Sequence, residues 1–329
     1  MPVIHSSYRP AWWLRHGHVQ TCWPVLFRDM PPLPCARRRM TLPDGDFLDV
    51  DVHRRQGSER SRRAVIISHG LEGNSRRKYV IGMARVCLEA GFDVLAWNMR
   101  SCSGQMNDTD RLYHMGQTGD VAAVADWALR QGYGELALMG FSMGGNQILK
   151  WLGENPDAVP TAVKLAFVVS VPCDLPSAAP RLDSLACRPY MEYFMRTMRR
   201  KVREKAARFP GYPSVAGMER CHTFREFDSR FTAPLYGFAS ADEYWAASSA
   251  APLLRSIRIP VCLLQAQDDP FCTPACFPVE AAERNPRFTL EIARHGGHVG
   301  FVVPGAGARY WSELRAAAFL RERWPWRRG

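Results

Sequence analysis

The sequence lacks the apolar runs that would place it in or across a membrane. It has no run of about 18 consecutive apolar residues, so we expect no transmembrane helix. The N-terminus has no basic segment followed by an apolar run, so we expect no signal peptide. The ten cysteines are scattered and form no CxxC pair, which argues against a disulfide framework. These absences predict a cytoplasmic protein with reduced thiols.

Signatures of metal sites and of nucleic-acid binding are also missing. Cys272 and Cys276 flank a loop, but no histidine cluster accompanies them, as a zinc site would require. The net charge is +11, yet no paired zinc spacing or RNA-binding signature is present. We therefore interpret the charge as arginine-rich composition. We expect no nucleic-acid partner, no metal and no organic cofactor.

The stretch from Glu135 to Glu154 is the most informative part of the chain. Leu136–Met139 is a short apolar run typical of a buried parallel strand, and apolar residues at helical spacing follow from residue 148. Between them, Gly-x-Ser-x-Gly centres on Ser142 and matches a nucleophile elbow, in which a sharp turn exposes the serine hydroxyl. The amide of Met143 would lie at a helix N-terminus, where it could stabilise an oxyanion.

Strands and helices alternate on both sides of this motif. This alternation predicts an α/β-hydrolase fold, with a mostly parallel sheet and helices on both faces. One strand ends in His69-Gly70-Leu71, the usual place of the second oxyanion donor, which would be the amide of Leu71. The predicted strands are 37–41, 47–53, 64–68, 92–97, 165–171, 259–266 and 288–292, and the predicted helices are 79–90, 118–130, 277–285 and 310–323.

The alternation is interrupted between residues 173 and 251, where no apolar strand is visible but apolar residues recur at helical spacing over 190–209. We therefore predict a helical cap at 173–251, inserted into a hydrolase core formed by 37–172 and 252–329. Residues 1–36 are predicted to be an N-terminal arm, irregular apart from about one helical turn. Four arginines lie off the apolar stripe of 190–209; they form either a solvated face or a weak contact with an anionic membrane surface. They are Arg196, Arg199, Arg200 and Arg203.

A serine nucleophile needs a histidine base that is oriented by an acid. The chain supplies these in the order expected for the fold: Ser142, then Asp268 or Asp269 after the penultimate strand, then a histidine after the last strand. The spacing from the strand end favours Asp269 as the acid, with Asp268 as the alternative. Two glycines directly precede His298, which suits a tightly turned loop and favours it over His295 as the base.

Several motifs resemble those of the YheT-type α/β-hydrolases, also called the AB hydrolase 4 family. They are Gly17-His18-Val19-Gln20-Thr21, His69-Gly70-Leu71-Glu72-Gly73, Cys102-Ser103-Gly104, Tyr113-His114, Gly140–Asn146, Thr232–Phe238, Asp268–Phe271 and Gly296–Phe301. The resemblance implies a carboxylic-ester hydrolase that uses Ser142, an aspartate of the 268/269 pair and His298. Eukaryotic relatives within this family act on phospholipids and medium-chain esters. Ser101 departs from the family pattern, which has glycine at this position.

The sequence therefore predicts a serine carboxylic-ester hydrolase that forms an acyl-enzyme with a small-molecule acyl ester. Two alternatives remain open at this point. The same acyl-enzyme could pass its acyl group to an alcohol or a thiol, as in an acyltransferase. The protein could also keep this fold without being an enzyme and bind anionic surfaces. The natural ester, its chain length and the oligomeric state are left open.

Overall fold

The structure is a computed structural model that describes residues 2–55, 61–305 and 309–324. Within these residues, a nine-stranded sheet has the order β1-β9-β8-β7-β6-β4-β5-β3-β2. The pairs β2–β3 and β3–β5 are antiparallel and the other pairs are parallel, which confirms the predicted mostly parallel sheet. The strands are β1 (Val3–His5), β2 (Ala36–Thr41), β3 (Phe47–His53), β4 (Arg63–Ser68), β5 (Asp93–Trp97), β6 (Glu135–Phe141), β7 (Val163–Val169), β8 (Val261–Ala266) and β9 (Phe288–Ala293).

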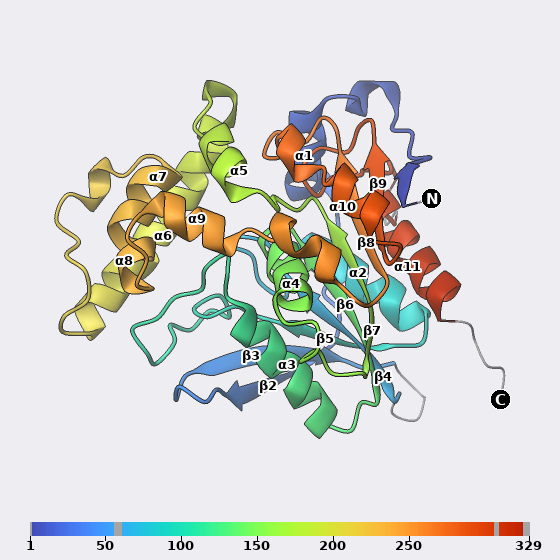
Figure 1. The fold of residues 1–329 in the computed structure, drawn as a ribbon, viewed down its shortest axis with the longest axis horizontal. Helices are drawn as coiled ribbons and strands as arrows, with labels where there is room; N and C mark the ends of the chain where they lie inside the picture. The colour runs from blue at the N-terminus through green and yellow to red at the C-terminus, as the bar shows by residue number, and fades with distance from the viewer. Residues whose placement is uncertain (1, 56–60, 306–308, 325–329) are drawn as a thin grey trace.

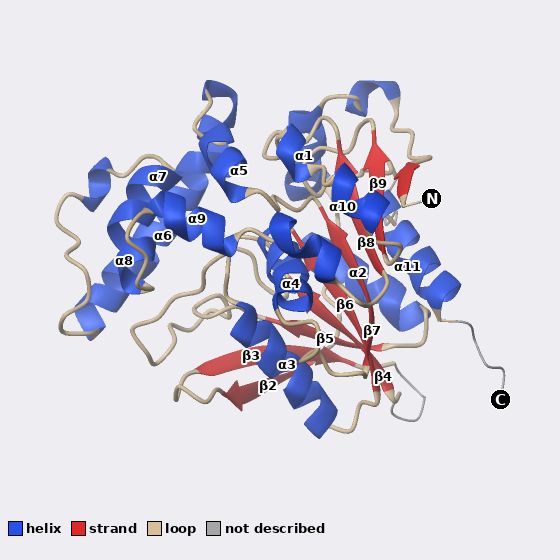
Figure 2. Cartoon of the chain, in the orientation of Figure 1, coloured by secondary structure: helices blue, strands red, loops and turns tan. Residues whose placement is uncertain are grey.

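Helices cover both faces of the sheet, as Figures 1 and 2 show. One apolar core lies between the sheet and α2 (Lys78–Glu89) and α11 (Trp311–Arg323). The other lies beneath α3 (Thr118–Arg130), α4 (Met143–Glu154) and α10 (Val279–Arg284). Central strands such as β4 and β7 are apolar on both faces because both faces are covered.

The far edge of the sheet is a polar hairpin. Asp49 and Asp51 on β3 accept bidentate hydrogen bonds from Arg39 and Arg37 on β2, with shortest N–O distances of 2.8 and 2.7 Å. These charged cross-strand pairs fix the register of the two strands. The turn between them contains Gly45, which adopts a φ of +80°.

The N-terminal arm is more regular than predicted. Its strand β1 pairs in parallel with β9, and α1 (Gly17–Phe27) is a helix of 11 residues rather than one turn. Pro24 lies inside α1 and obscures the helix in the sequence, because proline removes one helical hydrogen bond. Packing compensates for this loss: Gln20 on α1 and Leu14 just before it are fully buried.

The segment between β7 and β8 is helical and lies to one side of the sheet (Figure 1). Its helices are α5 (Leu175–Arg181), α6 (Arg188–Arg208), α7 (Phe224–Phe227), α8 (Ala233–Leu235) and α9 (Ala241–Ser248). They enclose a third apolar core, to which α6 contributes Met191, Met195 and Val202 at helical spacing. Among the described residues, no helix has both the length and the apolar character needed to span a bilayer.

Candidate active site

Ser142 lies in a strained turn between β6 and α4. Its backbone has φ +51° and ψ −120°, a conformation that residues other than glycine rarely adopt. The neighbouring glycines permit the tight turn: a Cβ on Gly144 would lie 2.4 Å from the carbonyl oxygen of His69, and one on Gly140 would lie 2.7 Å from Gly145 Cα. The predicted strand–turn–helix is therefore present, and its geometry lifts the serine hydroxyl above the sheet edge.

Three side chains from three strand ends form one hydrogen-bonded chain. Ser142 Oγ lies 2.9 Å from His298 Nε2, and His298 Nδ1 lies 2.9 Å from Asp269 Oδ2. Asp269 is almost fully buried, and its Oδ1 accepts a further bond from the amide of Phe271 at 2.8 Å. This carboxylate fixes the ring so that Nδ1 carries a proton and Nε2 faces the serine.

Asp268 faces away from the serine and supports the loop that carries His298. Its Oδ1 accepts a bond from the amide of Gly297 at 2.9 Å, and its Oδ2 lies 3.4 Å from His295 Nδ1. The structure thus places Asp269, the preferred acid, behind the imidazole of His298, and it pairs the two alternative residues with each other.

Three further residues hold the His298 loop and were not singled out as site residues from the sequence. Thr21 Oγ1 on α1 accepts a hydrogen bond from the amide of His298 at 2.9 Å. Ser170 Oγ accepts a hydrogen bond from the amide of Val299, and Gln20 Oε1 accepts one from the amide of Val302, both at 2.9 Å. The motif Gly17–Thr21 contains Gln20 and Thr21 but does not by itself indicate their role, and Ser170 lies outside it.

Leu71 and Met143 both line the cavity beside Ser142. Neither amide donates a hydrogen bond to any group in the described part of the chain, so both are free to bind an oxygen atom of a ligand. His69 fixes the loop of Leu71 instead of acting near the serine. Its Nδ1 donates to the Gly70 carbonyl at 2.8 Å and its Nε2 accepts from the Met99 amide at 3.1 Å. Burial lowers the pKa of His69 to about 4, so this imidazole is neutral at pH 7.

A buried ion pair connects this loop to the helical insertion. Lys201 on α6 lies 2.8 Å from Glu72 Oε1, and both side chains are less than one-tenth exposed. Tyr113 donates its hydroxyl hydrogen to the same carboxylate oxygen, and its own oxygen accepts from the Glu72 amide at 3.1 Å. Burial opposes ionisation of Glu72, but the charge of Lys201 and the hydrogen bonds that Lys201 and Tyr113 donate together outweigh it, so the pKa of the carboxyl is lowered. Glu72 adopts φ +54°, so the ion pair holds a strained residue next to Leu71.

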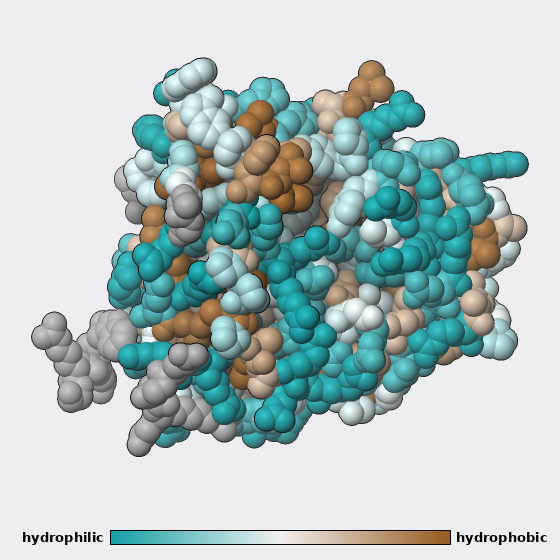
Figure 3. All heavy atoms as spheres, turned by 180° about the vertical axis from the view of Figure 1, so that it is seen from behind, coloured by the Kyte–Doolittle hydropathy of each residue, from teal (hydrophilic) through white to brown (hydrophobic). Residues whose placement is uncertain are grey.

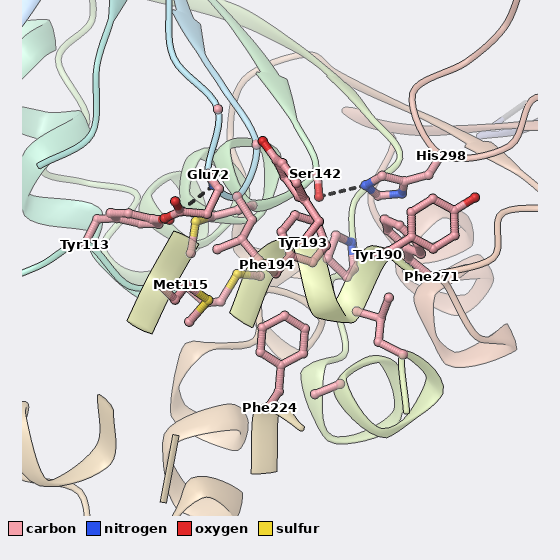
Figure 4. Close-up of a pocket in the computed structure, with 18 of the residues that line it drawn as sticks. Glu72, Tyr113, Met115, Ser142, Tyr190, Tyr193, Phe194, Phe224, Phe271 and His298 are labelled. Atoms are coloured by element: carbon pink, nitrogen blue, oxygen red, sulfur yellow. Dashed lines mark hydrogen bonds between the residues drawn. The ribbon is translucent and has the colours of Figure 1, made fainter. Parts of the chain in front are cut away.

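A cavity of about 660 Å³ opens onto Ser142 and His298 beneath the helical insertion. Figure 4 shows the serine and the imidazole facing each other, with the aromatic rings of Tyr190, Phe194 and Phe271 close by. Most of the lining is aromatic or aliphatic, whereas Glu72, Tyr113 and Lys201 form a polar group within it. The site therefore presents a reactive hydroxyl to an apolar chamber.

Ser101, which departs from the family pattern, lies in the neighbouring loop with φ +61°. This left-handed conformation explains a preference for glycine at the position. The side chain of Asn107 compensates by accepting the hydrogen bond of the Ser101 amide.

One group of possible metal ligands overlaps the same site. The ligand atoms of Asp269, Cys272 and His298 lie within 4.8 Å of one another. A hydrogen bond with Cys276 and burial raise the pKa of the Cys272 thiol well above its usual value. The 2.9 Å hydrogen bond between His298 Nδ1 and Asp269 Oδ2 accounts for the closeness of two of these three residues.

Comparisons with known proteins agree with this architecture. Residues 63–215 match the family model described as the alpha/beta hydrolase fold. YheT of Escherichia coli is 31% identical over 300 residues, which cover 90% of this chain and 87% of YheT. Human phospholipase ABHD3 is 28% identical, with 92% of this chain and 75% of the relative covered. A monoacylglycerol lipase of Saccharomyces cerevisiae is 30% identical over 78% of this chain and 58% of its own length.

A solved structure of a Pyrococcus furiosus esterase superposes with a TM-score of 0.59 at 17% identity, covering 90% of this chain and 96% of the other. This likeness concerns the fold. Together with the identity to YheT over nine-tenths of the sequence, it assigns the protein: the chain belongs to the YheT-type family of α/β-hydrolases.

Proposed function

We propose that this chain is a serine carboxylic-ester hydrolase that acts on esters with an apolar acyl group. The observation that carries the proposal is the hydrogen-bonded chain from Ser142 through His298 to Asp269, which opens into an apolar cavity. Relatives named a phospholipase and a monoacylglycerol lipase support the same class of reaction.

In the acylation step, Ser142 Oγ attacks the ester carbonyl carbon while His298 Nε2 takes the hydroxyl proton. The carbonyl oxygen becomes an oxyanion, which the amides of Leu71 and Met143 stabilise. Asp269 stabilises the imidazolium through the Nδ1–H bond without itself taking the proton. The C–O bond to the alcohol then breaks, and His298 gives its proton to the leaving oxygen, so that an acyl-serine remains.

In the deacylation step, a water molecule attacks the acyl-serine. His298 now takes a proton from the water, and the same two amides hold the second oxyanion. The bond to Ser142 Oγ breaks, the serine recovers its proton from His298, and the carboxylic acid leaves. Because the nucleophile, the base and the oxyanion donors are held before substrate enters, the step needs little reorganisation.

The cavity supports an aliphatic acyl chain as the group bound beside the serine. Phe271 and Phe224 are nearly buried in its wall, and Met115 and Leu71 add flexible apolar contacts. Each methylene that enters such a cavity contributes about 0.8 kcal/mol, or roughly fourfold in kcat/KM.

The test is hydrolysis of p-nitrophenyl esters of increasing acyl length by the native chain and by Ser142→Ala. We expect kcat/KM to rise with length until the cavity is filled, and Ser142→Ala to lose about 10⁴-fold or more in kcat. Ser184→Ala, a change in an N-cap serine of the helical insertion, serves as the matched control and should keep full activity. Equal turnover by the native chain and by Ser142→Ala would overturn the proposal.

A further inference from the structure

The exposed hydrophobic side chains gather on the N-terminal arm. Of the ten large hydrophobic side chains that are exposed in the described part of the chain, six lie between Trp12 and Phe27. Val25, Leu26 and Phe27 at the end of α1 are 69%, 66% and 63% exposed. Figure 3, the view from behind, shows a brown hydrophobic patch over α1 on an otherwise mostly hydrophilic face. Three consecutive exposed apolar residues cost solubility and call for a function.

Ring contacts connect Trp13 and Phe27 through the half-buried Trp23, and the end of α1 reaches the cavity. The rings of Trp13 and Trp23 lie 4.7 Å apart and those of Trp23 and Phe27 lie 4.5 Å apart, measured between centroids. Val25 and Leu26 belong both to the exposed surface and to the lining of the cavity that contains Ser142. Tyr193 on α6, which is 40% exposed, also lines the cavity. We call these residues the mouth surface: Trp13, Trp23, Val25, Leu26, Phe27 and Tyr193.

Cations border the mouth surface without acidic partners. Lys78 donates to the carbonyl oxygen of Val25 at 2.9 Å, and Arg77 donates to the hydroxyl of Tyr193 at 2.7 Å. Neither forms an ion pair with an acid in the residues that the structure describes. The first 28 residues contain no aspartate or glutamate at all. An apolar patch bordered by cations that have no acidic partner is complementary to acyl chains beneath anionic headgroups.

The basic face of α6 singled out in the sequence is less suited to this role. Arg203 pairs with Glu219 at 2.7 Å and Arg200 lies 3.8 Å from Glu204. Two of the four arginines on this face therefore lie close to acids of the insertion, whereas Arg77 and Lys78 have no acidic partner among the described residues. A second copy of the chain is also a poor occupant of the mouth surface, since both copies carry +11 and would present the same cations.

We propose that the mouth surface docks on an anionic lipid membrane, with Val25, Leu26 and Phe27 inserted at the level of the headgroups and Arg77 and Lys78 facing lipid phosphates. The cavity would then open at the membrane surface, where an ester could enter it without crossing water. Docking itself does not depend on the role of Ser142; only the delivery of an ester rests on the proposed function.

The test is sedimentation of the full chain with vesicles of phosphatidylcholine alone and of phosphatidylcholine mixed with phosphatidylserine. We expect binding to the mixed vesicles that weakens several-fold as salt is raised. The triple variant Val25→Ser, Leu26→Ser, Phe27→Ser should bind at least about tenfold more weakly. The double variant Val279→Ser, Leu314→Ser removes exposed apolar residues from α10 and α11 and should bind like the native chain.

Circular dichroism and thermal melting of each variant verify that it is folded, and Ser142→Ala should bind vesicles like the native chain, which separates docking from catalysis. Equal binding by the triple and the double variants, or no binding by the native chain, overturns the proposal. So does a native dimer in light scattering that the triple variant converts to a monomer while vesicle binding persists, because the mouth surface would then contact a second copy.

Discussion

Replacing Lys201 with methionine tests how the helical insertion controls the loop of Leu71. The substitution keeps most of the length of the side chain and removes its charge. It leaves the Glu72 carboxylate buried, with the Tyr113 hydroxyl still donating to it. Leu71 and Gly70 directly precede Glu72 in the chain, so a shift of Glu72 displaces the amide of Leu71, which we assign to the oxyanion.

The size of the effect follows from the burial of the pair. Removal of one partner from a buried ion pair costs about 3–5 kcal/mol in the free energy of unfolding. A chain of 329 residues has an unfolding entropy of about 0.7 kcal/mol/K, so Lys201→Met should lower Tm by about 4–7 °C. Misplacement of one oxyanion donor should lower kcat by roughly 10²-fold with little change in KM.

Lys205→Met is the matched control for this experiment. Lys205 lies one turn further along α6, is also buried, and donates to the carbonyl oxygens of Asn107 and Thr109 rather than to Glu72. Its loss should lower Tm but keep kcat within about threefold of the native value. The double variant Glu72→Gln, Lys201→Met replaces the ion pair with a neutral pair and should recover most of the lost kcat.

The assay is steady-state hydrolysis of a short p-nitrophenyl ester, with thermal melting of each variant. Lys201→Met with native kcat would refute the reasoning, because the loop would then hold its position without the ion pair. An equal loss of kcat in Lys205→Met would refute it as well, since the effect would then come from general loosening of α6.

Other changes test separate parts of the structure. Asp269→Asn should lower kcat by roughly 10³–10⁴-fold, whereas Asp268→Asn should cost less than about tenfold; the reverse order in an ester assay would reassign the acid. Burial raises the pKa of the Asp228 carboxyl to about 6 in the folded chain. Asp228 therefore ionises at a lower pH in the unfolded chain than in the folded one, and the free energy of unfolding falls as pH rises from about 4 to 6. Asp228→Asn should therefore be more stable than the native chain above pH 6, by up to about 3 kcal/mol, and a melting series that shows no such pH-dependent difference would contradict the pKa shift. Gly144→Ala would bring its Cβ within 2.4 Å of the His69 carbonyl, so soluble, fully active protein from this variant would contradict the geometry of the turn.

Much of the fold was predictable because the central strands are locally distinctive. Runs such as Val65-Ile66-Ile67 are apolar throughout, and the helices between them carry one apolar side, so each element is recognisable without its neighbours. The parallel order then brings the strand ends to one edge, which is why residues as distant as Ser142 and His298 could be predicted to meet.

The parts that could not be predicted depend on contacts between distant residues. Pro24 argues locally against a helix, and only the burial of Gln20 against the His298 loop explains why α1 persists through it. The ion pair between Glu72 and Lys201 joins residues that are 129 positions apart. Lys201 lies on α6, and no local sequence pattern predicts how α6 is oriented over the sheet. The size and lining of the cavity follow from that same orientation.

The most direct measurement of the central claim is mass spectrometry of the chain after treatment with a fluorophosphonate, which reacts with an activated serine. We expect a single adduct on the peptide that contains Ser142, formed at least about 10³-fold more slowly in His298→Ala. An adduct on another residue, or labelling of Ser142 at the native rate in His298→Ala, would contradict the account.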